Sequence, residues 1–185
     1  MPINLCANKP ETEIEISAFD QTKDMNTIKV ILQAEWDKMF IGFKPMDENI
    51  INNFFFKKEL AYNEPVTIKV ARINDKTAGF IAYGNVNEKG YIHLLGIKKE
   101  FQHQGLGQAL LVTAEKDLHQ IGVQKLVIEV LSNNLPAINL YKKFGFSDGI
   151  YFDKFNTVEM NKNITSSPFE DYWAKVAFDL ALCAV

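Results

Sequence analysis

An apolar strand, a loop with two glycines and the start of a helix follow one another in YIHLLGIKKEFQHQGLGQ, residues 91–108. Apolar residues continue at helical spacing over 105–121, and Gly122 is placed to end that helix. The apolar segment 124–131 predicts a second strand. Together the three elements form a βαβ unit, whose strands should be parallel and whose crossover should be right-handed.

Further strand and helix patterns lie on both sides of this unit. Alternating or β-rich segments predict strands, and apolar residues at helical spacing predict helices. The predicted strands are 12–19, 66–73, 77–86, 91–98, 124–131, 149–155 and 157–164, and the predicted helices are 24–39, 47–62, 105–121 and 134–144. We therefore expect an α/β (α+β) fold with a mixed, mostly antiparallel central sheet flanked by helices.

The composition is that of one soluble globular domain. The chain has 185 residues, of which 47% are hydrophobic and 23% are charged, and this balance excludes a disordered chain. No stretch approaches the roughly 20 apolar residues of a membrane span, so we expect no membrane partner. Arg72 is the only arginine among 20 basic residues, and the formal net charge is −3. Because arginine is the preferred residue for phosphate and base contacts, we expect no nucleic-acid partner.

The cysteines and the first residues bear on metal binding and location. Cys6 and Cys183 form no CxxC pair and no Cys/His cluster, so we expect free thiols and no metal site. The first residues lack the basic and apolar segments of a secretory signal. Both observations favour a cytoplasmic location.

A separate helical pattern follows the last predicted strand. Ser167 and Glu170 form a capping box, and Pro168 occupies the favoured first helical position. We expect residues 165–185 to form a helical extension packed on a domain of residues 1–164. A dimer contact is the alternative use of this helix, so the expected state is a monomer or a homodimer.

The loop between the strand and the helix of the βαβ unit has the form of an anion-binding site. Glycines allow a close approach of the backbone to a ligand, and the N–H groups of a first helical turn favour anions. The amides from His103 to Gln108 are therefore expected to hold a pyrophosphate. The loop lacks the Lys-Ser/Thr of a P-loop, and Leu110 stands where a dinucleotide fingerprint has its third glycine. A tight turn without a ligand is the structural alternative.

A second informative segment is NNLPAINLYKKFGF, residues 133–146. Asn134, Ala137 and Tyr141 are three or four residues apart and share one helical face. Taken alone, Tyr141 would be a core aromatic residue. Its order and spacing after the glycine loop favour a place in the same site.

These two segments resemble the GNAT superfamily of acyl-CoA-dependent N-acetyltransferases. The resemblance rests on Q-x-x-G-x-G at 102–107, on N-x-x-A-x-x-L-Y at 134–141 with Gly145 and Phe146 after it, and on V-E-M-N-K at 158–162. It covers residues 75–164. The resemblance implies that the strand before the glycine loop splays away from its parallel neighbour and that coenzyme A enters the V-shaped gap.

The resemblance also implies a role for each side of this gap. The main chain of Leu95, Gly96 and Ile97 would bond to the pantetheine arm and the acetyl carbonyl, with Gly96 marking a β-bulge. Asn134 would contact the pantetheine arm. Lys142, like the adjacent Lys143, is a candidate for the 3′-phosphate or else a solvated surface residue. The remaining cofactor-binding residues are Gln102, His103, Gln104, Gly105, Leu106, Gly107 and Gln108.

Acyl transfer to an amine requires a proton donor and a proton acceptor. A primary amine with a pKa of about 10 is protonated at pH 7 and must lose a proton before it attacks. The resemblance makes Tyr141 the general acid for the thiolate leaving group. Many relatives carry a glutamate where this chain has Tyr91, so His93, on the same strand face, is the candidate base. Glu129 on the neighbouring strand is the second candidate, and a hydrogen-bonded core role is the alternative for His93.

The expected function is transfer of an acetyl group from acetyl-CoA to a primary amine by direct attack in a ternary complex. The alternative is an acyl-CoA-binding sensor or interaction module without turnover. The sequence leaves the acceptor open, and we expect its pocket to lie between the loop 40–47 and the region 149–157. Candidate residues for that pocket are Phe40, Phe43, Tyr151, Phe152, Asp47, Glu48 and Asp153.

Overall fold

The computed structural model describes residues 14–39, 51 and 66–164 of the chain. In these residues the elements are β1 (Ile14–Ala18), α1 (Gln21–Met39), β2 (Thr67–Ile73), β3 (Lys76–Val86), β4 (Lys89–Ile97), the 3-10 turn η2 (Lys99–Phe101), α3 (Leu106–Gln120), β5 (Lys125–Leu131), α4 (Leu135–Lys143), β6 (Ser147–Phe152) and β7 (Thr157–Asn163). Each corresponds to a predicted strand or helix, apart from η2, which the sequence pattern did not indicate. The expected helix 47–62 and the expected extension 165–185 lie outside the described residues, apart from Ile51.

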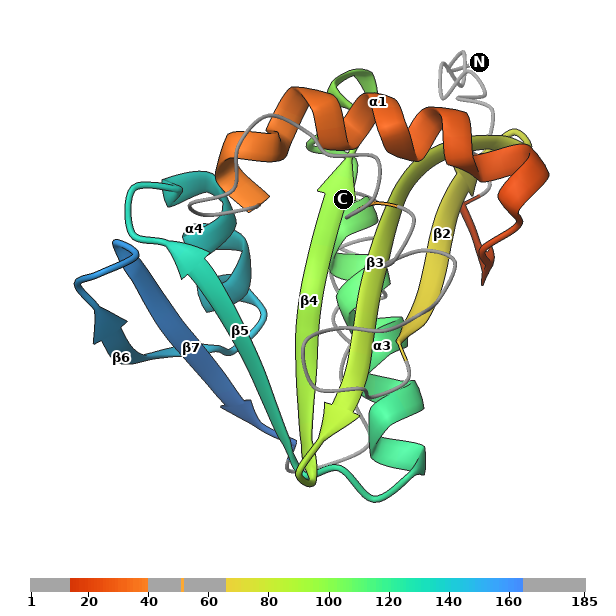
Figure 1. The fold of residues 1–185 in the computed structure, drawn as a ribbon. Helices are drawn as coiled ribbons and strands as arrows, with labels where there is room; N and C mark the ends of the chain where they lie inside the picture. Colours follow the sequence, from red (N-terminus) through yellow and green to blue (C-terminus); the bar gives the residue numbers. More distant parts are fainter. Residues whose placement is uncertain (1–13, 40–50, 52–65, 165–185) are drawn as a thin grey trace, which may run out of the picture.

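The described strands form one seven-stranded sheet in the order β1-β2-β3-β4-β5-β7-β6. Neighbouring strands are antiparallel except for the central pair β4 and β5, which are parallel. This pair is joined at only three positions, from Gly90 opposite Leu126 to Ile92 opposite Ile128. Beyond Ile92 the two strands separate into a V, which Figure 1 shows between the green and teal strands. The mixed sheet and the splayed parallel pair are therefore confirmed.

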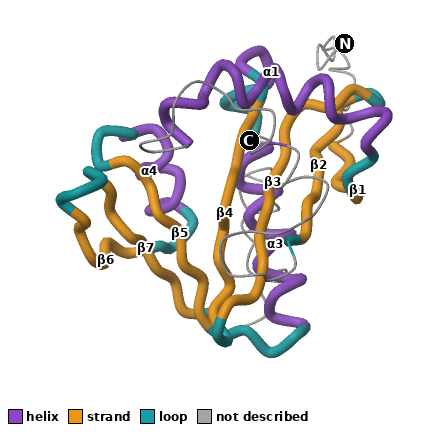
Figure 2. The backbone as a smooth tube through the Cα atoms, viewed as in Figure 1, coloured by secondary structure: helices purple, strands orange, loops and turns teal. Residues whose placement is uncertain are grey.

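Helices cover the two faces of the sheet and enclose two apolar clusters. On one face Ile28, Ile31 and Leu32 of α1 pack in a cluster with strand residues such as Phe80. On the other face α3 and α4 pack in a second cluster, with Leu110 wholly buried. Figure 2 shows α1 along one end of the sheet and α3 behind it. The site between β4 and β5 is thus held between two packed layers.

A β-bulge in β4 lies at His93. Tyr83 pairs with Ile92 and the adjacent Ala82 pairs with Leu94, so β4 has one extra residue at this point. In a regular strand Ile92 and Leu94 would face the same side of the sheet. Because of the bulge they face opposite sides, and Ile92 packs in the α3 cluster whereas Leu94 packs in the α1 cluster. The sequence-based expectation of a bulge at Gly96 is corrected: Gly96 pairs regularly with Phe80.

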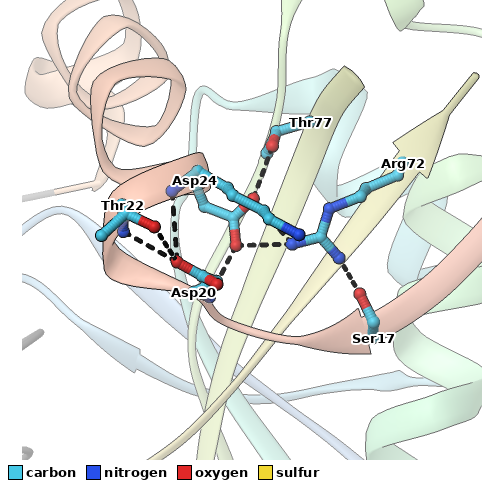
Figure 3. A network of polar contacts seen from close by, with 7 residues as sticks. Ser17, Asp20, Thr22, Asp24, Arg72 and Thr77 are labelled. Atoms are coloured by element: carbon cyan, nitrogen blue, oxygen red, sulfur yellow. Dashed lines mark hydrogen bonds and ion pairs between the residues drawn. The ribbon is translucent and has the colours of Figure 1, made fainter. Parts of the chain in front are cut away.

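The single arginine of the chain is part of a buried polar network (Figure 3). The guanidinium of Arg72 in β2 donates to both carboxylate oxygens of Asp24 in α1, at 2.9 and 2.8 Å. Thr77 of β3 donates to the same carboxylate at 2.6 Å, and Arg72 also donates to Ser17 of β1. Asp24 is fully buried. The network therefore fastens the first turn of α1 to the sheet, and it makes the role of this arginine structural.

No helix in the described ranges is long and apolar enough to cross a membrane.

Candidate active site

A cleft of about 550 Å³ opens where β4 and β5 diverge. Its walls come from β4, the loop after it, the start of α3, β5 and α4, with Glu35 added from α1. Most of the residues selected from the sequence lie in its lining. They are His93, Leu95, Gly96, Ile97, Gln102, His103, Gly105, Leu106, Gly107, Gln108, Glu129, Asn134 and Tyr141. Segments more than 40 residues apart in sequence thus meet in one cleft.

The loop before α3 leaves main-chain N–H groups for a ligand. Gly105 is the N-cap of α3 in the left-handed region, with φ of 81°, and no side chain caps this helix. His103 also has a positive φ of 61°, which is unusual for a residue other than glycine. The first-turn N–H groups, which other helices pair with a capping side chain, therefore remain for an anion at the end of the cleft.

Two glutamine side chains of this loop form hydrogen bonds to main-chain carbonyls. The side-chain amide of Gln102 donates to the carbonyl of Ile97 at 3.1 Å, and that of Gln104 donates to the carbonyl of Glu100 at 3.2 Å. Gln102 lines the cleft, whereas Gln104 is exposed and lies outside its lining. The first glutamine of the motif thus ties the loop to the end of β4 by a side-chain to main-chain hydrogen bond.

Tyr141 and Asn134 lie on the α4 side of the cleft. Asn134 is the N-cap of α4, and its side-chain oxygen accepts from the N–H of Ala137 at 3.4 Å. Tyr141 is 5% exposed, its ring packs against Phe146, and burial raises the pKa of its hydroxyl above the ordinary value. That hydroxyl has no hydrogen-bond partner among the residues that the structure describes. Tyr141 is therefore a protonated donor facing the cleft at neutral pH.

His93 and Glu129 both line the cleft at the start of the V. Each is the residue that follows the last parallel pair, Ile92 with Ile128. Burial lowers the pKa of His93 to about 4, so its imidazole is neutral at pH 7, and the ring stacks on Tyr91. Glu129 is exposed, and its carboxylate accepts a hydrogen bond from the hydroxyl of Thr157.

Of the described lysine and acceptor-pocket candidates, only Lys143 lines the cleft. Lys143 lines the cleft, whereas Lys142 lies outside its lining and pairs with Asp148 at 2.8 Å on the surface. Tyr151, Phe152 and Asp153 are exposed and contribute nothing to the lining. The other acceptor candidates, Phe40, Phe43, Asp47 and Glu48, lie outside the described residues.

Among the polar residues at or beside this site, sequence reasoning missed Glu35 and Thr157. Glu35 lines the cleft from α1, and Thr157 holds Glu129 from β7. Neither belongs to a local motif, because Glu35 reaches the cleft only through the packing of α1 on the sheet, and Thr157 reaches Glu129 only through the register of β7 with β5. For Thr157 a weak signal exists, since it begins the strand that closes the resemblance.

The comparisons with known sequences agree with this arrangement. The sequence model of the Acetyltransferase (GNAT) family matches residues 28–146. The N-alpha-acetyltransferase of Sulfurisphaera tokodaii is 28% identical over 108 residues, covering 51% of this chain and 64% of that protein. The [Ribosomal protein bS18]-alanine N-acetyltransferase of Escherichia coli (strain K12) is 35% identical over 75 residues, covering 40% and 51%. The chain thus spans between half and two thirds of the length of these curated relatives.

Solved structures share the fold. The PaiA N-acetyltransferase of Thermoplasma acidophilum, solved in complex with coenzyme A, has a TM-score of 0.66 and 22% identity, covering 82% of this chain and 99% of that one. A GNAT-family acetyltransferase from Staphylococcus aureus Mu50 has a TM-score of 0.67 and 15% identity, covering 83% and 100%. At these identities the likeness concerns the fold alone, whereas the family model covers more than half of the sequence. The chain belongs to the acetyltransferase (GNAT) family.

Proposed function

We propose that the protein transfers the acetyl group of acetyl-CoA to a primary amine by direct attack in a ternary complex. One observation carries the proposal: a free strand edge, an uncapped helix N-terminus and a buried tyrosine share one cleft. Acetyl-CoA has a thioester that a strand edge can bind, a pyrophosphate that a helix N-terminus can bind, and a thiolate leaving group that a tyrosine can protonate. Family membership supports the same reaction.

Acetyl-CoA lies along the cleft in this proposal. The main chain of Leu95, Gly96 and Ile97 bonds to the pantetheine arm and polarises the acetyl carbonyl, because no described strand pairs with that edge of β4 beyond Ile92. The amides from His103 to Gln108 hold the pyrophosphate. The amide nitrogen of Asn134 donates to the pantetheine arm. Lys143 takes the 3′-phosphate in preference to Lys142, since Lys142 is engaged with Asp148.

Tyr141 acts as the general acid. The amine nitrogen bonds to the carbonyl carbon, the carbon–sulfur bond breaks, and the departing sulfur takes the phenolic proton. Tyr141 then regains a proton from water, which balances the proton that the amine loses. A thiol has a pKa of about 8.5, so protonation eases its departure. The buried phenol remains protonated until that moment, because burial disfavours its ionised form.

The amine loses its proton at the start of the V, where His93 and Glu129 line the cleft. Burial lowers the pKa of His93 and so favours its neutral form, which makes this imidazole a poor proton acceptor. The exposed carboxylate of Glu129 attracts the ammonium and can pass a proton to water. We therefore favour Glu129 as the proton acceptor and assign His93 to the wall beside it.

The proposal is tested by mixing the full chain with acetyl-CoA and a panel of amines and following free thiol. The panel contains a small monoamine, a polyamine and a peptide with an N-terminal alanine, the last because a relative acts on such a terminus. Thiol release that depends on one amine is the expected result. Coenzyme A binding without thiol release from any amine would identify a sensor, and absence of coenzyme A binding would overturn the proposal.

A further inference from the structure

We propose that Thr157 is a positioning residue, which fixes the carboxylate of Glu129 at the start of the V. This inference rests on the proposed function, in which Glu129 accepts the proton of the amine. It is carried by the hydrogen bond from Oγ1 of Thr157 to Oε1 of Glu129.

The register of two strands brings these side chains together. Glu129 of β5 pairs with Glu159 of β7, and Leu131 pairs with Thr157. Residues two apart in a strand share a face, so Glu129 and Thr157 are diagonal neighbours on one side of the sheet. This side is opposite to that of Ile128 and Met160, which pack in the α3 cluster. The hydrogen bond between Thr157 and Glu129 therefore lies on the face of the sheet where Glu129 lines the cleft.

The burial of the two residues is unequal. Thr157 has no exposed surface, whereas Glu129 is exposed to the cleft. A buried hydroxyl lowers stability unless it is hydrogen-bonded, and valine would fill the same space without that requirement. Among the described residues, Glu129 is the hydrogen-bond partner of the Thr157 hydroxyl, so valine would keep the packing and remove that bond.

The hydroxyl of Thr157 also restricts the rotamers of the Glu129 side chain. A glutamate side chain at an exposed position has many rotamers, and Glu159 stands directly opposite with a like charge. Among the residues that the structure describes, Thr157 is the hydrogen-bond partner of this carboxylate. The complete burial of Thr157 limits the positions that its hydroxyl donor can take. Without it, the carboxylate would turn away from the attacking amine.

The kinetic test compares Thr157→Val, Thr157→Ser and Glu129→Gln with the acceptor found in the amine panel. Misplacing a catalytic group by about 1 Å can lower a rate by about 100-fold. We expect Thr157→Val to lower kcat about tenfold or more with an unchanged KM for acetyl-CoA, and Thr157→Ser to retain most of the rate. In the Glu129→Gln background, Thr157→Val should have no further effect, because the two residues act as a unit.

A matched control removes a hydroxyl elsewhere. Thr113 of α3 donates to the carbonyl of Ala109 at 3.0 Å, and Thr113 lies outside the lining of the cleft. Thr113→Val should leave kcat unchanged. Thr157→Ala, which also removes the hydroxyl, replaces the valine variant if that variant does not fold. An unchanged kcat in Thr157→Val, or an undiminished effect in the Glu129→Gln background, would overturn the proposal.

Crystal structures give a readout that does not depend on turnover. We expect the Glu129 carboxylate to keep its place in the wild type and in Thr157→Ser, and to move or lose order in Thr157→Val. The same Glu129 conformation in all three proteins would contradict the positioning role. If the wild type transferred acetyl to no amine, the proposed function would fail, and these structures would still decide whether Thr157 positions Glu129.

Discussion

Tyr141 has the two properties that its proposed role as proton donor to sulfur requires. It is nearly inaccessible and its pKa is raised by burial, yet it lines the cleft with a hydroxyl that bonds to no other described residue. We expect Tyr141→Phe to lower kcat by about 100-fold or more, the range typical of general acid catalysis, with little change in the KM for acetyl-CoA. Steady-state thiol release measures both constants. Tyr83→Phe, which changes a buried tyrosine outside the cleft lining, is the control, and equal turnover in the wild type and Tyr141→Phe would remove Tyr141 from the mechanism.

His93 makes stability depend on pH. Its pKa is about 4 in the folded chain and about 6.5 when unfolded, so between these values the unfolded state binds more protons and stability rises with pH. On going from about pH 7 to about pH 5, this histidine should remove about 2 kcal/mol of stability. Urea unfolding of the wild type and His93→Gln at both pH values measures the difference. The exposed His119→Gln should behave as the wild type does, and an equal acid loss in His93→Gln would contradict this explanation.

Among the site residues, the predictable ones are those that belong to local motifs. Gly105 was selected because a glycine loop before a helix depends on a few adjacent residues, and Asn134 was selected because it begins the motif N-x-x-A-x-x-L-Y. Glu35 and Thr157 could not be predicted in this way. Their places depend on how α1 crosses the sheet and on the register between β5 and β7, which no short pattern encodes.

At the scale of elements, the start of α1 is fixed to β2 and β3 by the Arg72–Asp24 pair. Removing one partner of a buried pair leaves the other charge without compensation. We expect Arg72→Met to lower the free energy of unfolding by about 3–5 kcal/mol. Urea denaturation measures this loss, and Lys142→Met is the control, because its ion pair is half-exposed and should contribute at most about 1 kcal/mol. Similar losses in both variants would contradict the structural role of Arg72.

The same scale explains why the elements were predicted and the bulge was misplaced. Strand and helix periods report which residues face the core, and they fixed the elements to within a few residues. A glycine in a strand is only a weak sign of a bulge, and Gly96 instead sits in a regular pair with Phe80. The extra residue is His93, where the strand turns over between its two apolar clusters.

For the molecule as a whole, the central feature is the V between two parallel strands. A sheet that was paired along its whole length would satisfy the free edge of β4 and close the cleft. Three paired positions hold the strands together, and the divergence beyond them exposes main-chain groups between two packed layers. In the proposed function, these main-chain groups and helix amides bind the phosphate-rich ligand, and the one arginine stays in its structural network.

The most direct test is a crystal structure of the full chain with coenzyme A. We predict the pantetheine arm along residues 95–97, the pyrophosphate over the amides of residues 103–108, and the sulfur within hydrogen-bond reach of the Tyr141 hydroxyl. Coenzyme A bound outside the cleft between β4 and β5, or bound with its sulfur remote from Tyr141, would contradict the account.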